Sequence, residues 1–242
     1  MSTRTVAGAV GAWFLLAFVL YIVGGVMVGS GAGNPADLSR VAAHPTLIAS
    51  CALLMMVNSL AIAAIGVLMF PVLRRGHEVA AYGSLVCRSF EAMLLVVGTV
   101  FLLLLIPLGE EYGAAEGQPS DLPALARVAQ EAQHYSYQVG MLAVGISGLL
   151  LRRVLLRTGL VPGPLALVGL FGCAALFAGS VLEVLGYAVG TALSVPGGLF
   201  EVALGVLLLV KGFSAQDGDG TQPSNADETC LRPATAALTG VR

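Results

Sequence analysis

Charged side chains are scarce in this sequence. Asp, Glu, Lys and Arg make up 11% of the 242 residues, whereas hydrophobic residues make up 57%. Soluble globular domains carry about 25% charged residues. A soluble fold of this length has no interior large enough for so much apolar surface. The scarcity of charge therefore excludes an ordinary soluble domain and predicts a chain that is largely embedded in a lipid bilayer.

Sequence motifs of known chemistry are lacking as well. The four cysteines, Cys51, Cys87, Cys173 and Cys230, form no C-x-x-C or zinc-finger spacing, and the three histidines indicate neither a haem nor a metal site. The sequence has no dinucleotide fingerprint, phosphate-binding loop or G-x-S-x-G motif. It also lacks the basic patch with aromatic residues that nucleic-acid binding requires. We predict no cofactor, no metal and no nucleic-acid partner.

What the chain has instead is a series of long apolar runs. Each is roughly 20 residues or longer, which is enough to cross the hydrocarbon core as a helix. The runs also lack the alternation of a membrane barrel strand. We therefore predict an all-α, multi-pass bundle with six transmembrane helices, in contact with the lipid bilayer of a bacterial-type cytoplasmic membrane. The expected spans are residues 7 to 28, 47 to 71, 80 to 108, 131 to 151, 163 to 188 and 196 to 212.

The distribution of basic residues predicts the orientation of the bundle. Arginines and a lysine lie before the first span, between spans two and three, between spans four and five, and after span six. The opposite connections carry most of the acidic residues, among them Glu110 and Glu111. By the positive-inside rule, the N-terminus and C-terminus are both cytoplasmic. Residues 1–213 form the expected transmembrane domain, and the polar, aperiodic residues 214–242 form an expected disordered cytoplasmic tail.

Polar residues within the expected spans are the candidate functional site. An ionised side chain at the centre of a membrane helix costs at least about 2.5 to 3.5 kcal/mol, so such residues usually have a partner or a function. Their depths predict a polar cavity in the outer half of the bundle, with Arg88 and Glu91 as its floor. The candidate residues are Asn58, Arg88, Glu91, His134, Gln138, Glu183 and Glu201.

Each candidate also has a purely structural interpretation. The Arg88 and Glu91 side chains lie three residues apart on one helix face and fit an ion pair that only clamps helices together. His134 and the two tyrosines beside it fit an aromatic belt at the membrane interface. Asn58 and Gln138 fit interhelical hydrogen bonds. Glu183 is expected near the outer surface, where water can reach it, whereas Glu201 is the carboxylate that we most expect to face a cavity.

Several short runs resemble a bacterial six-helix membrane family known as domain of unknown function 4386. The runs are Cys87 to Ala92, His134 to Tyr137, Leu149 to Leu151, Arg157 to Pro162, Val195 to Glu201 and Leu209 to Phe213. The resemblance covers roughly residues 5 to 213, and the family pattern matches Arg88, Glu91, His134 and Glu201. One departure is the basic Leu151-Arg152-Arg153 where the family often has Gly-Tyr-Leu. The resemblance implies fold and topology and adds no substrate.

Three classes of function remain open from the sequence. The first is a protein that binds or relays a small molecule, an ion or a proton through Glu91, His134 and Glu201. The second is a membrane-embedded enzyme that uses buried carboxylates for acid/base chemistry on a lipid or isoprenoid. The third is a non-catalytic partner subunit, in an oligomer or larger complex, whose polar residues serve helix packing. A cavity that opens sideways into lipid would favour the enzyme.

Overall fold

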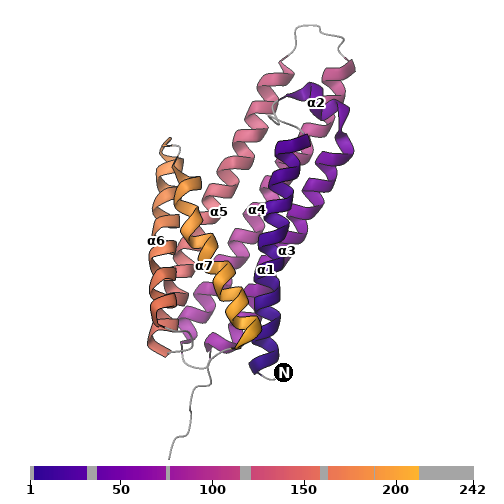
Figure 1. Cartoon of the computed structure of the whole chain (residues 1–242). Helices are drawn as coiled ribbons and strands as arrows, with labels where there is room; N and C mark the ends of the chain where they lie inside the picture. Colours follow the sequence, from indigo (N-terminus) through magenta and orange to yellow (C-terminus); the bar gives the residue numbers. More distant parts are fainter. Residues whose placement is uncertain are drawn as a thin grey trace, which may run out of the picture.

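The computed structural model describes residues 3–31, 37–74, 77–114, 121–158, 163–187 and 189–212. These residues form seven helices and contain no strand (Figure 1). The expected tail, residues 214–242, lies outside the described residues. In chain order the helices are α1 (Thr3–Gly31), α2 (Leu38–Ala43), α3 (Pro45–Arg74), α4 (Glu78–Ala114), α5 (Leu122–Thr158), α6 (Gly163–Val184) and α7 (Gly190–Val210).

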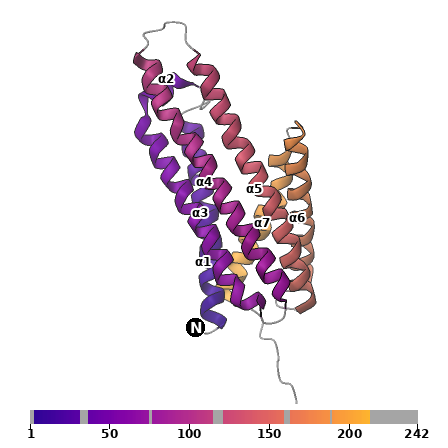
Figure 2. The same cartoon turned by 180° about the vertical axis from the view of Figure 1, so that it is seen from behind.

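The six long helices form a closed ring in which each helix packs mainly against its neighbours in the chain. Helix α1 packs on α3, α3 on α4, α4 on α5, α5 on α6 and α6 on α7, and α7 closes the ring against α1. Figures 1 and 2 show the two faces of this ring, with α6 and α7 ending well short of the far ends of α4 and α5. A ring of this kind has an interior to which all six helices contribute.

Exposed charges are distributed unequally between the two ends of the ring, although each end also carries charges of the other sign, such as Arg40 and Glu78. The end that holds the N-terminus carries exposed Arg4, Arg74 and Lys211, and we call it the basic end. The opposite end carries exposed Asp37, Glu110, Glu111 and Asp121, and we call it the acidic end. Helices α3, α4 and α5 therefore run between the basic and the acidic end, whereas α6 and α7 stop short of the acidic end.

Five of the long helices are long and apolar enough to cross a membrane, by length and composition alone. They are α1, α3, α4, α6 and α7. The expected fourth span lies within α5. This helix is more polar than the others because it contains Gln130, His134 and Gln138, which follow one another at helical spacing. The described residues thus contain five candidate spans, and the multi-pass membrane prediction is confirmed at that level.

Several expected helix boundaries differ in the structure. The last helix was expected from residue 196, but α7 begins at Gly190 and contains Pro196. Membrane helices accommodate proline because neighbouring helices stabilise the interrupted turn. Glu201 therefore lies eleven residues from the start of α7, about 16 Å along the axis, rather than about one and a half turns. At the acidic end, residues 109–114 and 122–130 simply extend α4 and α5.

The short helix α2 at the acidic end was not anticipated from the sequence. It is too short to show a periodic apolar pattern, yet Leu38 and Val41 are fully buried against α3 and α4. Asp37 caps its first turn by accepting hydrogen bonds from the backbone N–H and the hydroxyl of Ser39. The hydroxyl contact holds the pKa of Asp37 below its usual value. Helix α2 thus covers the acidic end of α3 and α4.

The half of the ring toward the basic end has a continuous apolar core. Residues of α1, α3, α4, α5 and α7 meet there, and we call them the packed cluster: Ala7, Val10, Phe14, Ile65, Met69, Leu73, Ala81, Leu151, Phe200, Leu204 and Leu208. Glycines bring the backbones close, since a methyl group on Gly11 would lie 2.6 Å from the carbonyl oxygen of Gly205. This crossing of α1 and α7 closes the ring at the basic end.

Candidate functional site

A charged triad of Arg88, Glu91 and Glu201 lies where the packed cluster ends. Nη1 of Arg88 donates a 2.9 Å hydrogen bond to Oε2 of Glu91, one turn further along α4. Nη2 donates a 2.8 Å bond to Oε1 of Glu201 on α7. Because α4 and α7 are not neighbours in the ring, the guanidinium bridges its interior. Arg88 therefore links two opposite walls through charge-assisted hydrogen bonds.

The environment of the triad explains how a membrane interior holds three charges. The side chains of Arg88 and Glu91 are 7% and 3% exposed, and that of Glu201 is 30% exposed. The guanidinium carbon lies 5.7 Å from the ring centre of Phe14, within cation–π distance. A methyl group on Gly66 would lie 3.0 Å from Cβ of Arg88, so glycine there leaves room for the arginine. Burial is offset because each charge has an opposite partner.

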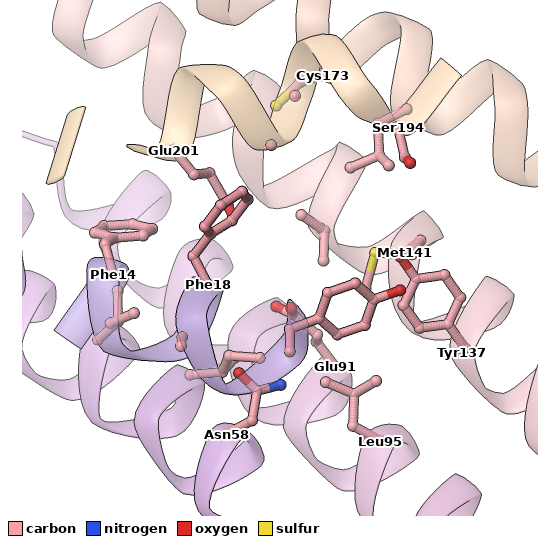
Figure 3. A pocket seen from close by; sticks show the side chains of 18 of the residues that line it. Phe14, Phe18, Asn58, Glu91, Leu95, Tyr137, Met141, Cys173, Ser194 and Glu201 are labelled. Carbon is pink, nitrogen blue, oxygen red and sulfur yellow. The ribbon is translucent and has the colours of Figure 1, made fainter. Parts of the chain in front are cut away.

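A cavity of about 290 Å³ extends from the triad toward the acidic end. All six long helices line this central cavity, and Figure 3 shows the ring of side chains around it. Arg88 and Glu201 stand at its inner end beside Phe14, whereas Ile22 and Ser194 stand at its outer end. The cavity is closed at the packed cluster and mostly apolar along its length. It is close to the size of small-ligand pockets, about 300 to 1,000 Å³.

Asn58 adds a second polar group to this cavity. Its side chain projects into the cavity from α3, as Figure 3 shows, and the residue is only 5% exposed. No hydrogen bond joins its amide to another of the described residues. Buried amides in folded proteins normally have such a partner, from protein or from water. Asn58 is therefore a polar group in an apolar wall whose hydrogen bonds a ligand or water can complete.

Part of the cavity wall also faces outward from the ring. Four lining residues have large exposed fractions, namely Tyr21 on α1 at 44%, Ile22 on α1 at 46%, Val195 on α7 at 55% and Leu199 on α7 at 63%. Between these helices Phe18 packs close to Gly198. A methyl group on that glycine would lie 3.7 Å from the phenyl ring. The side of the cavity between α1 and α7 thus has a thin apolar wall that faces the surroundings of the bundle.

The remaining candidate residues lie elsewhere. Nε2 of His134 on α5 is 3.4 Å from Oε1 of Glu183 on α6, in a separate cavity of about 570 Å³ near the acidic end of α6. Gln138 lines a groove of about 520 Å³ between α1, α4 and α5. The structure therefore brings Asn58 together with the triad and places the other three candidates outside the central cavity.

Several residues that line the cavity were not singled out from the sequence. Phe14, Phe18 and Tyr21 project from one face of α1, where their spacing of four and three residues could have indicated a common wall. Tyr137, one of the two tyrosines beside His134, lines the cavity and stacks on Tyr21 with ring centres 5.8 Å apart. Its neighbour Tyr135 is 45% exposed, as a belt residue would be. The two tyrosines thus have different environments.

The donor set favours charge recognition and proton transfer over metal binding. Two carboxylates face one guanidinium, so the fully ionised triad carries one excess negative charge. Throughout the residues that the structure describes, no three His, Cys, Asp or Glu side chains lie close enough to share a metal ion. The site can therefore accept a positively charged or hydrogen-bond-donating group at its inner end and apolar groups along its walls.

Fold and site together define a multi-pass, all-helical membrane protein with a polar cluster inside its ring. Residues 9–212 match the family described as domain of unknown function DUF4386, and the chain belongs to this family. The resemblance noted from the sequence is thereby confirmed. No curated protein and no solved structure matches the chain.

Proposed function

We propose that the chain crosses the membrane six times, with its basic end and both termini in the cytoplasm. The separation of charge between the two ends favours this orientation by the positive-inside rule. Helix α5 serves as the sixth span because it closes the ring between α4 and α6, and Gln138 of its polar stripe is buried within the bundle. The acidic end then lies outside the cell.

Within this topology, we propose that the central cavity binds a small molecule that has an apolar body and a cationic or hydrogen-bond-donating group. The observation that carries the proposal is the charged triad at the closed end of an otherwise apolar cavity. The excess carboxylate selects a positive or donor group, and the partly exposed Glu201 side chain is the group that meets it. The apolar walls hold the body of the molecule.

The unsatisfied Asn58 amide supports a bound molecule over a purely structural clamp. An ion pair that only holds α4 to α7 requires no cavity beside it and no buried amide on the neighbouring helix α3. Asn58 instead gives the site a second polar contact point besides the triad. Two such points fix the orientation of a small ligand.

Native mass spectrometry of the full chain, purified in mild detergent, tests this proposal. The wild type is compared with Glu201→Gln, which keeps the shape and removes the charge, and with Asn58→Leu. We expect a bound small molecule in the wild type and a marked loss of it in both variants. Extraction and mass identification of the released species then show whether it carries a cationic or donor group.

The matched control is Glu110→Gln, an exposed carboxylate on α4 outside the cavity. It should retain the wild-type complement of bound species. If the wild type carries no bound molecule, or if Glu201→Gln and Glu110→Gln retain it equally, the central cavity is not the binding site. If Glu201→Gln lowers the thermal unfolding temperature without losing a ligand, the structural clamp is favoured instead.

Lipid-directed acid/base catalysis is the second candidate, and the thin wall between α1 and α7 favours it. Exposed Ile22, Val195 and Leu199 form that wall, so a lipid or isoprenoid group could reach the triad sideways. Glu91 and Glu201 would then donate and accept the proton. A modified lipid that accumulates with wild type in defined nanodiscs, and not with Glu201→Gln, would establish this function in place of simple binding.

A further inference from the structure

Three of the bundle's cavities adjoin one another in a series. The cavity that contains the His134 and Glu183 pair, here called the vestibule, shares Gln130, Gln133 and His134 with the groove. The groove in turn shares Tyr21, Ile22 and Tyr137 with the central cavity. Neighbouring cavities thus meet at common side chains from the acidic end to the triad.

The stacked pair of Tyr21 and Tyr137 stands where the groove meets the central cavity. Their ring planes are inclined by only 16°. Tyr21 belongs to α1 and Tyr137 to α5, and these two helices are not principal packing partners in the ring. Side chains rather than backbone therefore separate the two cavities, and a rotation about side-chain torsions is sufficient to open the passage.

Polar groups along this series indicate an aqueous solute rather than a lipid chain. Gln138 lines the groove, is 3% exposed and has no hydrogen bond to another of the described residues. A buried amide of this kind is completed by water or by a polar ligand, and an alkyl chain would leave it unsatisfied. The vestibule also contains Glu131 and Glu183, and further carboxylates surround the acidic end.

Carboxylates stand at both ends of the series, whereas the lining of the groove between them contains none. Carboxylates at the acidic end raise the local concentration of cations. The two carboxylates of the triad exceed its single guanidinium at the inner end. A small, water-soluble organic cation, such as an amine, is thus favoured at the entrance and again at the end of the series.

We propose that the vestibule and groove are the entry path of a water-soluble organic cation to the triad, and that the Tyr21 and Tyr137 pair is the constriction controlling its access. The inference rests on the proposed function, because it assigns a ligand class and a route to the same site. It differs from the lipid alternative in the side from which the site is reached.

Cysteine labelling in nanodiscs tests the route independently of any bound ligand. The full chain carries Met141→Cys, which places a thiol in the central cavity, and alanine at Cys51, Cys87, Cys173 and Cys230. One reagent is a trimethylammonium-ethyl methanethiosulfonate, which is cationic and does not enter lipid, and the other is the lipid-permeant N-ethylmaleimide. We expect Tyr21→Ala to raise the labelling rate of the cationic reagent severalfold and to leave that of N-ethylmaleimide unchanged.

Further variants separate a constriction from general loosening. Tyr21→Phe keeps the stacked ring and should label at the parent rate, and so should Tyr82→Ala, an exposed tyrosine on α4 outside the path. A methyl group on Gly25, in the groove, would meet no atom within 4 Å. Gly25→Leu should therefore fill the groove and slow the cationic reagent, which keeps the test decisive if Tyr21→Ala does not fold.

The outcomes also distinguish the route from the binding function. If N-ethylmaleimide labels the thiol and the cationic reagent never does, access is from lipid and the proposed path is wrong. Equal rates for the cationic reagent in the parent, Tyr21→Ala and Gly25→Leu proteins would likewise exclude the constriction. Neither result bears on whether a molecule copurifies with the central cavity, which the comparison of wild type with Glu201→Gln decides separately.

Discussion

The two halves of the ring are built from similarly apolar sequence but differ in packing. Toward the basic end, side chains of five helices interlock and the glycines approach neighbouring backbones within contact distance. Toward the acidic end, α2 to α5 have an apolar core of their own, but α6 and α7 stop early and the space between α1 and α5 is crossed by the Tyr21 and Tyr137 rings. Close glycine contacts also occur there, as at Gly109 against α2, so the extent of α6 and α7 rather than glycine content distinguishes the two halves.

The charged triad marks the boundary between the packed and the hollow half. On one side its members contact the packed cluster through Phe14, and on the other they face the central cavity. A cavity is a loss of packing contacts, so the hollow half is expected to contribute less to stability than the packed half. The following predictions test whether stability and ligand handling divide between the halves in this way.

The largest loss of stability is expected for Arg88→Met. Removing the guanidinium leaves Glu91 and Glu201 in a buried site without their cation, and breaking a buried ion pair costs about 3 to 5 kcal/mol. We expect a large fall in the thermal unfolding temperature in detergent. The fluorescence of Trp13, the single tryptophan, can follow the transition.

A triple variant serves as the control for this prediction. Arg88→Met with Glu91→Gln and Glu201→Gln removes all three charges and should recover much of the lost stability, because no unpaired ion remains. If Arg88→Met alone unfolds at the wild-type temperature, the triad does not join the two halves, and the boundary drawn here is wrong.

An intermediate loss of stability is expected for Gly11→Ala in the packed half. Its new methyl group would lie 2.6 Å from the carbonyl oxygen of Gly205, so α1 and α7 must separate. Overpacking of this kind costs about 1 to 3 kcal/mol. The matched substitution Gly25→Ala lies on the same helix in the hollow half, where a methyl group meets nothing within 4 Å. The thermal unfolding temperature should therefore fall for Gly11→Ala and not for Gly25→Ala.

The sequence predicts the helical, multi-pass membrane class well, because that class depends on local composition. It also indicated Arg88 and Glu91 as a pair, since residues three apart share a helix face. The Arg88 to Glu201 bond could not be predicted, because it depends on α7 closing against α1 at Gly11 and Gly205. Helical spacing gives the direction of each side chain and leaves open which distant helix it meets.

The division of the candidate residues among three cavities was beyond the sequence for a similar reason. His134 and Gln138 are four residues apart and share a stripe of α5, so a single cavity was the natural expectation. His134 meets Glu183 near the end of α6, whereas Gln138, one turn deeper along α5, lines the groove between α1, α4 and α5. The neighbouring helix that each side chain meets, rather than spacing within one helix, determines this difference.

The smallest changes in stability are expected when a single hydroxyl group in the packed half or a single amide group in the hollow half is removed. The hydroxyls of Ser84 on α4 and Ser147 on α5 lie 3.3 Å apart in the packed half and share a hydrogen bond. Interhelical hydrogen bonds in membranes contribute about 0.6 kcal/mol on average, so Ser84→Ala should lower stability by about that amount. Asn58→Leu in the hollow half removes an amide without a protein partner, and its unfolding temperature should stay level or rise. A loss of stability for Asn58→Leu larger than that for Ser84→Ala, measured on ligand-free protein, would show that the amide supports packing and that the two halves do not differ in this respect.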